Sequence, residues 1–211
     1  ITWQPVPRLA GFIAGADLDA FDRDGFVLVR GALDPAEVDE VRLALDAYEA
    51  AVTRWLERRG GTVEISDAAS ITFSVHAVLR SEVARRFAAH PVFARLALDL
   101  LGPDVRLYWD QAVYKKPEPD REFPWHQDNG YTFVEPQHYL TCWVPLTPAT
   151  VDNGCPEIAV GAHLDGTLEH RWVDPTGWRC FDEAPASVPV EAEVGDVVCF
   201  SSLTPHRTGP N

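Results

Sequence analysis

The chain has 211 residues, of which 46% are hydrophobic and 24% charged, so it can bury a sizeable core without a disulfide scaffold. Its formal net charge of −14 argues against nucleic acid or an anionic membrane surface as the main partner, because phosphate binding depends on clustered lysine and arginine. Four cysteines without C-x-x-C spacing argue against a structural zinc site and a dense disulfide framework, and they favour the reducing cytoplasm as the location.

The N-terminal part begins with a short segment at 16–23, followed by the apolar run 25–31, which is bounded by glycines and typical of a strand. The clearest helix comes next. Asp34 is a good N-cap, Pro35 fits the first helical position, and Glu37 completes a capping box. Apolar residues then repeat at steps of three or four, at Val38, Val41, Leu45, Tyr48, Val52 and Trp55.

The glycine pair at 60–61 should end this helix, and a second helical stretch is predicted from about 81 to 101. Proline restarts rather than continues a helix, so His90–Pro91 should divide that stretch in two. From residue 105 onward the pattern changes to short β-type runs separated by turn residues, which is typical of a β-sandwich or barrel. The predicted strands are 105–115, 125–133, 140–146, 157–160, 188–193 and 197–201.

Together these elements predict one domain over 1–211. Its expected fold class is mainly β with flanking helices. A helical half over about 1–104 buttresses a double-stranded β-helix, a jelly-roll or cupin-like sandwich, over about 105–211. No apolar run approaches the roughly 20 residues of a membrane span, and no basic segment followed by a hydrophobic one opens the chain, so we expect neither an anchor nor an export signal.

Two short motifs, His126-Gln127-Asp128 and a distant His206, combine two imidazoles with one carboxylate. If 124–131 enters a strand, the period of two places His126 and Asp128 on one face and Gln127 on the other. A strand at 195–201 would then place His206 just past its end. Such a triad suits Fe(II), because it fills one face of an octahedron and leaves the other open. A His-x-Asp pair alone is a weak signal, and the three residues together predict a metal-dependent oxygenase.

An ordered set of motifs resembles the phytanoyl-CoA dioxygenase family: Asp24–Val29, Trp125–Asn129, Asp152–Pro156, Gly161–His163, and Gly195–Phe200 leading to His206. The resemblance implies a double-stranded β-helix, Fe(II), O2, and 2-oxoglutarate as the co-substrate that is decarboxylated to succinate. It also implies that the matching His126, Asp128 and His206 are the metal ligands, with no separate catalytic residue required. Because Asp128 is retained where related halogenases have a small residue, hydroxylation or another oxidation begun by hydrogen abstraction is favoured.

Co-substrate contacts follow from the same resemblance. It implies an arginine for the distal carboxylate on the strand after His206, beyond Asn211, unless the anchor comes from elsewhere. Trp143 and Thr208 occupy positions that resemble co-substrate contacts, although Trp143 could equally be a core aromatic. Further candidates on the strand before the metal motif are Gln111, Tyr114 and Lys115, of which Lys115 could instead be a solvated strand end. Arg207 should point away from the site.

Substrate contacts are predicted for Asn129 and Tyr131, although Asn129-Gly130 is also a strong turn signal. The stretch 166–186 is long for a connection between strands, so we expect either a lid or wall over the pocket or a surface excursion with its own apolar cluster. His163 is expected at a structural turn. The remaining histidines are expected to be surface or hydrogen-bonded residues: His76, His90, His138 and His170.

The expected partner is a small organic substrate, such as a natural-product intermediate, rather than nucleic acid or a membrane. A CoA ester is less attractive, because the chain is acidic and has no basic cluster for its phosphates. Two alternatives remain open, since one fold hosts many chemistries. One is a cupin-like metalloenzyme that does not use 2-oxoglutarate, and the other is a non-catalytic jelly-roll binding protein.

Overall fold

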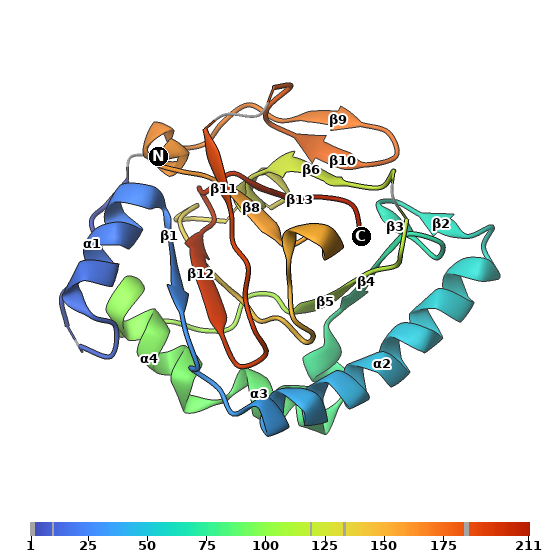
Figure 1. Cartoon of the computed structure of the whole chain (residues 1–211), viewed down its shortest axis with the longest axis horizontal. Coiled ribbons are helices and arrows are strands. Elements are labelled where there is room, and N and C mark those ends of the chain that lie inside the picture. The colour runs from blue at the N-terminus through green and yellow to red at the C-terminus, as the bar shows by residue number, and fades with distance from the viewer. Residues whose placement is uncertain (1–2, 10, 119, 133, 184–185) are drawn as a thin grey trace.

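Two facing antiparallel sheets form the centre of the computed structural model, which describes all residues except 1–2, 10, 119, 133 and 184–185 (Figure 1). The first sheet has the order β1 (Phe26–Val29), β12 (Val197–Ser201), β7 (Leu140–Trp143). The second has the order β11 (Ser187–Pro189), β8 (Pro156–Ala159), β13 (His206–Thr208), β6 (Phe123–His126). The predicted double-stranded β-helix core with flanking helices is confirmed.

The strand β12 explains how the two layers share a core. All five of its residues are buried, and successive side chains point to opposite faces. Val198 and Phe200 pack between the sheets with Ile158 of β8, whereas Val197 and Cys199 pack toward the helices. A strand covered on both faces reads as a continuous apolar run, which is why this segment shows no polar alternation.

Helices cover the outer side of this arrangement (Figure 1). α1 (Gly15–Asp24) and α4 (Pro91–Leu100) pack their apolar sides against the first sheet. α2 (Pro35–Glu57) and α3 (Glu82–Ala88) cover the ribbon of β4 (Ile71–Val75) and β5 (Gln111–Lys115). The Asp34 side chain accepts a hydrogen bond of 2.9 Å from the Ala36 amide, so the predicted N-cap is confirmed.

Several element boundaries differ from the sequence-based predictions. The strand expected over 105–115 forms only at Gln111–Lys115, and the strand expected over 125–133 runs instead over Phe123–His126. Residue 133 lies outside the described residues. The strand β4 and two short hairpins were not predicted: β2 (Thr62–Val63) with β3 (Ser66–Asp67), and β9 (Arg171–Val173) with β10 (Gly177–Arg179). Short 3-10 turns occur at Ala77–Leu79, Asp128–Gly130, Val151–Asn153 and Ala162–Asp165.

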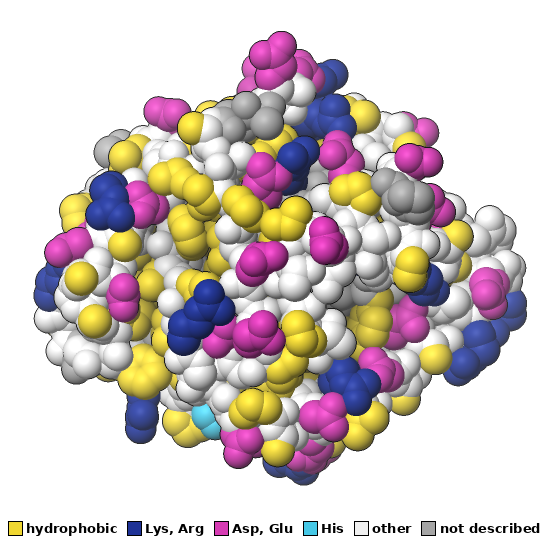
Figure 2. Space-filling view, in the orientation of Figure 1, with side chains coloured by type: hydrophobic (Ala, Val, Ile, Leu, Met, Phe, Trp, Pro, Cys, Tyr) yellow, Lys and Arg dark blue, Asp and Glu magenta, His cyan; other side chains and the backbone are white. Residues whose placement is uncertain are grey.

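The surface mixes charge types. On the face shown in Figure 2, acidic side chains lie among basic and apolar ones rather than in a single patch. Among the described residues, no helix combines the length and the apolarity needed to cross a bilayer. The cytoplasmic location stays a prediction.

Candidate metal centre

The segment that carries the His-x-Asp motif leaves its strand between His126 and Asp128. β6 ends at His126, and Asp128 begins a 3-10 turn, so the expectation that one strand delivers both residues is corrected. Gln127 nevertheless keeps an extended backbone, with φ −106° and ψ 143°. Because the extended conformation continues through Gln127, His126 and Asp128 still point to the same side. His206, the first residue of β13, lies directly opposite His126 in the antiparallel register.

Three possible ligand atoms converge at this end of the sheet. Nε2 of His126 and Nε2 of His206 each lie 3.8 Å from Oδ1 of Asp128. The ligand atoms of the three residues all lie within 4.8 Å of one another, and both histidines are buried. The structure therefore brings together the triad that the sequence predicted.

Hydrogen bonds orient both imidazoles. Nδ1 of His126 lies 2.8 Å from the Pro124 carbonyl oxygen, and Nδ1 of His206 lies 3.0 Å from the Thr204 carbonyl oxygen. A carbonyl oxygen only accepts, so each Nδ1 carries a proton, and in the neutral form of either ring Nε2 is the nitrogen free to bind a metal. Burial, and then the neighbouring His206, lower the pKa of His126 well below its usual value. The ring is therefore neutral, as a metal ligand must be.

The carboxylate of Asp128, the third predicted ligand, is held by a residue that the sequence did not indicate. Thr141 of β7 donates a hydrogen bond of 2.5 Å from Oγ1 to Oδ2 of Asp128, which leaves Oδ1 toward the histidines. Hydrogen bonding of a ligating carboxylate in this way fixes its orientation. Residues two apart on a strand share a face, and Thr141 lies two residues before Trp143 on β7. The prediction for Trp143 could therefore have indicated Thr141 as well.

Aromatic rings surround the triad. The Phe200 ring centroid lies 4.5 Å from that of His206, and the Phe123 and Tyr131 centroids lie 4.7 and 5.4 Å from that of His126. The Tyr131 hydroxyl accepts a 3.1 Å hydrogen bond from the Trp178 amide, and burial raises the pKa of its phenol. Apolar surroundings of this kind limit solvent access to a metal centre.

Two of the predicted co-substrate residues lie together. Nζ of Lys115 donates hydrogen bonds to Oγ1 of Thr208 at 3.0 Å, to the Thr208 carbonyl at 3.3 Å, and to the Gly209 carbonyl. Each of these acceptors is neutral. Burial lowers the pKa of the Lys115 ammonium to about 8. The group is therefore a partly buried cation whose hydrogen-bond acceptors carry no charge.

The other co-substrate candidates are placed differently. Trp143 packs against the apolar cluster between the sheets, opposite Val198. Gln111 is exposed and accepts a 3.2 Å hydrogen bond from Nε1 of Trp109. Tyr114 donates a 2.8 Å hydrogen bond from its hydroxyl to Asp46 of α2. Gln111 and Tyr114 are therefore not brought to Lys115 and Thr208.

Of the two predicted substrate residues, only Tyr131 lies against a metal-site ring. Asn129 is buried and donates a 2.8 Å hydrogen bond from Nδ2 to Oγ1 of Thr167, in the 166–186 stretch. Among the other histidines, His163 is buried with Nε2 3.2 Å from the Asp22 carbonyl, and His170 accepts a 3.0 Å hydrogen bond from the Gln127 amide.

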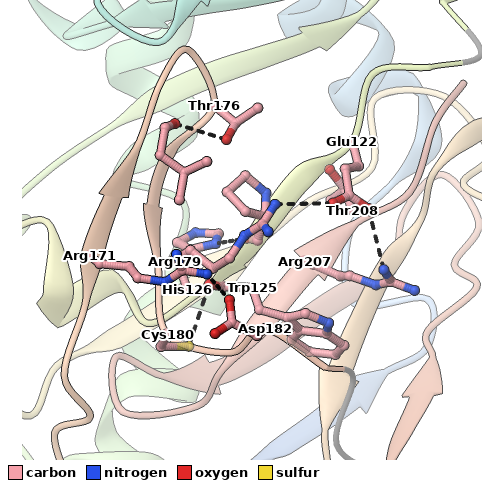
Figure 3. A network of polar contacts seen from close by, with 12 residues as sticks. Glu122, Trp125, His126, Arg171, Thr176, Arg179, Cys180, Asp182, Arg207 and Thr208 are labelled. Carbon is pink, nitrogen blue, oxygen red and sulfur yellow. Dashed lines mark hydrogen bonds and ion pairs between the residues drawn. The ribbon is translucent and has the colours of Figure 1, made fainter.

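Arg207 follows His206 directly, and because neighbouring side chains of a strand alternate, it points to the opposite face of the second sheet, as predicted. Figure 3 shows its guanidinium near Glu122 and Trp125. Its Nε donates a 2.6 Å hydrogen bond to Glu157 of β8, and its Nη1 lies 3.4 Å from Glu122. The guanidinium also lies 5.3 Å from the centroid of the Trp125 ring. These contacts hold a cation on the side of β13 opposite the triad.

Two packed sheets that carry two histidines and an aspartate at one end define a class of protein, the non-haem iron oxygenases with a facial ligand set. The two neutral imidazole nitrogens and the carboxylate oxygen fit Fe(II). Residues 21–211 match the family described as Phytanoyl-CoA dioxygenase (PhyH), and the chain belongs to this family.

Individual known proteins resemble the chain in sequence or in fold. Methylphosphonate hydroxylase from Gimesia maris is 25% identical over 213 residues, covering 94% of this chain and 75% of that protein. The epimerase SnoN, solved with Fe3+, alpha-ketoglutarate and nogalamycin RO, has a TM-score of 0.64 and 27% identity over 92% of this chain and 75% of its own. EctD from S. alaskensis, solved with 2-oxoglutarate and 5-hydroxyectoine, has a TM-score of 0.71 and 23% identity over 100% of this chain and 76% of its own.

The chain is accordingly a 2-oxoglutarate-dependent non-haem iron dioxygenase, and it uses Fe(II), 2-oxoglutarate and O2. The predictions of family, enzyme class and cofactors are confirmed. These findings favour neither the cupin-like enzyme without 2-oxoglutarate nor the non-catalytic binding protein.

Proposed function

We propose that this dioxygenase hydroxylates a small organic substrate and that His126, Asp128 and His206 are its iron ligands. The observation that supports the proposal most directly is that the Nε2 atoms of His126 and His206 each lie 3.8 Å from Oδ1 of Asp128. Two neutral nitrogens and one carboxylate oxygen leave further coordination positions for a co-substrate. Iron bound there, with 2-oxoglutarate, supplies the chemistry that activates O2.

The residues of the chain then have distinct tasks. The Pro124 and Thr204 carbonyls hold the two imidazoles in one tautomer, and Thr141 holds the carboxylate. Phe123 and Tyr131 pack against the His126 ring and exclude water from that side. Orientation and exclusion of water are the contributions that a protein makes when a cofactor carries the oxidation.

Lys115 and Thr208 are proposed to bind a carboxylate of 2-oxoglutarate, with Trp143 as a wall of the same pocket. The support is electrostatic. The partly buried Lys115 ammonium hydrogen-bonds neutral acceptors, and the nearby Glu122 carboxylate offsets only part of the effect of burial on its pKa, so a directly bound carboxylate would stabilise the charge further. Thr208 lies two residues after His206 on β13, which places it on the same side of the strand. The arginine expected beyond Asn211 stays a prediction.

The substrate is proposed to be a small organic molecule. Retention of Asp128 supports hydroxylation, because the carboxylate occupies the coordination site that a halide would need. The names of the relatives, methylphosphonate hydroxylase and the epimerase SnoN among them, indicate small molecules of differing chemistry. The aromatic rings of Phe123 and Tyr131 beside the triad suit an organic ring or chain.

The test is an anaerobic titration with Fe(II) and 2-oxoglutarate, monitored by the weak visible metal-to-ligand charge-transfer band. The wild type should show the band only when both are added, and His126→Ala should lose it while keeping its circular dichroism spectrum. A metal-loaded wild type without the band would contradict use of 2-oxoglutarate at this site. A band of full intensity in His126→Ala would contradict the assigned ligand.

A further inference from the structure

The long stretch 166–186, of which 184–185 lie outside the described residues, docks along the metal-bearing segment (Figure 3). The Cys180 amide donates a 2.8 Å hydrogen bond to the Trp125 carbonyl, and Arg179 lies 3.5 Å from Glu122. At its far side Trp172 is 46% exposed and packs edge-on against Trp178. These contacts seat this stretch, called the wall below, against the metal-bearing segment, and it carries a small apolar cluster of its own. Its place over a substrate pocket stays a prediction.

The first residues of this wall, Gly166 to Leu168, form its root and contact the side chain of Gln127, which lies between His126 and Asp128. Gln127 is fully buried and points away from the triad. Its Nε2 donates to the Gly166 carbonyl at 2.8 Å and to the Leu203 carbonyl at 2.6 Å. Its Oε1 accepts a 2.8 Å hydrogen bond from the Leu168 amide. All three contacts are to backbone groups.

These contacts join three parts of the chain at one amide. Gln127 itself stands between His126 and Asp128, Leu203 lies three residues before His206, and Gly166 and Leu168 begin the wall. A primary amide offers two N–H donors and one acceptor oxygen, which is the set required here. A carboxylate of the same size has no donor, and an apolar side chain has neither donor nor acceptor.

We infer that Gln127 is a positioning residue, which sets the spacing of the two histidine-bearing segments and couples the root of the wall to the metal centre. The inference rests on the proposed function in one respect, namely that His126, Asp128 and His206 bind the metal. Gln127 acts through its neighbours and contacts none of the three ligand atoms. Its loss should therefore loosen the metal site while the fold remains.

The experiment compares Gln127→Glu and Gln127→Met with a control, Thr167→Val. Thr167 lies between Gly166 and Leu168, and its hydroxyl bonds Asn129 and Gln137 rather than Gln127. Affinity for Co(II) alone, without 2-oxoglutarate, is measured from its visible d–d absorption. Both Gln127 variants should bind Co(II) about 10–100-fold more weakly than the wild type and with an altered spectrum. Thr167→Val should stay within about twofold of the wild type.

Hydrogen exchange in the wild type gives a readout that does not depend on either variant folding. Co(II) should slow exchange of the Leu168 amide, which donates to Gln127, although Leu168 lies far along the chain from each ligand. Wild-type affinity in both Gln127 variants, an equal loss in Thr167→Val, or unchanged exchange at Leu168 would each overturn the inference alone. A wild type that binds no Co(II) would overturn the proposed function together with the inference.

Discussion

His126 and His206 are each oriented by the carbonyl two residues before them, whereas Lys115 and Thr208 meet across 93 residues of chain. The orientation of each imidazole is thus set within a short segment, although the two rings meet only because β13 pairs with β6. The proposed co-substrate end depends instead on how β5 lies relative to β13. The two ends should therefore respond differently to substitution.

Removal of the carboxylate ligand should have the largest effect. Asp128→Ala is expected to weaken Co(II) binding by about 100-fold or more, since loss of a mere outer-shell partner typically costs 10–100-fold. Visible absorption titration measures the affinity, and Asp152→Ala, an exposed carboxylate in the turn Val151–Asn153, serves as the control. Equal affinities in the two variants would show that Asp128 is not a ligand.

Loss of the Lys115 cation, at the proposed co-substrate end of the site, should leave metal binding unchanged. Lys115→Met keeps the length of the side chain, so Co(II) affinity should be unchanged. Affinity for 2-oxoglutarate should fall about 10–100-fold, as expected when a charge-assisted hydrogen bond is lost. Calorimetric titration of the Co(II)-loaded protein measures this step. Unchanged 2-oxoglutarate affinity would remove Lys115 from the co-substrate site.

The hydrogen bond that orients Asp128 should matter less than the ligand itself. Thr141→Val removes the hydroxyl donor at nearly constant volume and should weaken Co(II) affinity by about tenfold, at the lower end for outer-shell partners. Thr176→Val, which removes a hydroxyl bonded to the Val173 carbonyl in the wall, is the comparison. If both variants bind Co(II) as the wild type does, the Thr141 hydroxyl has no role in metal binding.

Alkaline pH should weaken 2-oxoglutarate binding gradually, with the smallest effect just above pH 8. Burial lowers the pKa of Lys115 to about 8, so the ammonium is charged below that pH and loses its proton as the pH rises through it. The dissociation constant of 2-oxoglutarate should be flat below pH 8 and should then rise by up to about tenfold per unit, as for one linked proton. The same titration of Lys115→Met should lack this inflection, and an identical inflection in both proteins would assign it to another group.

The comparison of the two ends also explains what the sequence could predict. The spacing of His126 and Asp128 correctly predicted that both side chains point to one side, because Gln127 keeps the extended backbone even where the strand ends. The same spacing indicated that Gln127 points the other way. Its partners could not be predicted, since Gly166 and Leu203 lie 39 and 76 residues away.

Other features depended on tertiary structure in the same way. Thr141 reaches Asp128 only because β7 lies beside the turn at Asp128–Gly130, and Tyr114 faces α2 because it alternates with Lys115 along β5. The hairpin of β2 and β3 has two residues in each strand, which is too short to show a period of two. Motifs and long periodic elements were therefore predicted, while the side-chain hydrogen bonds between distant segments were not.

The antiparallel pairing of β13 with β6 has one more consequence, which concerns pairing errors during folding. A slip of one residue turns every side chain of a strand to the opposite face. In β13 it would replace the His206 imidazole with the Arg207 guanidinium, and a permanent cation would then stand where a metal ion has to bind. The contacts of Arg207 with Glu157, Glu122 and Trp125 are made only in the observed alignment, so the ion-pair cluster on the outer face favours the register that brings His206 to the triad on the inner one.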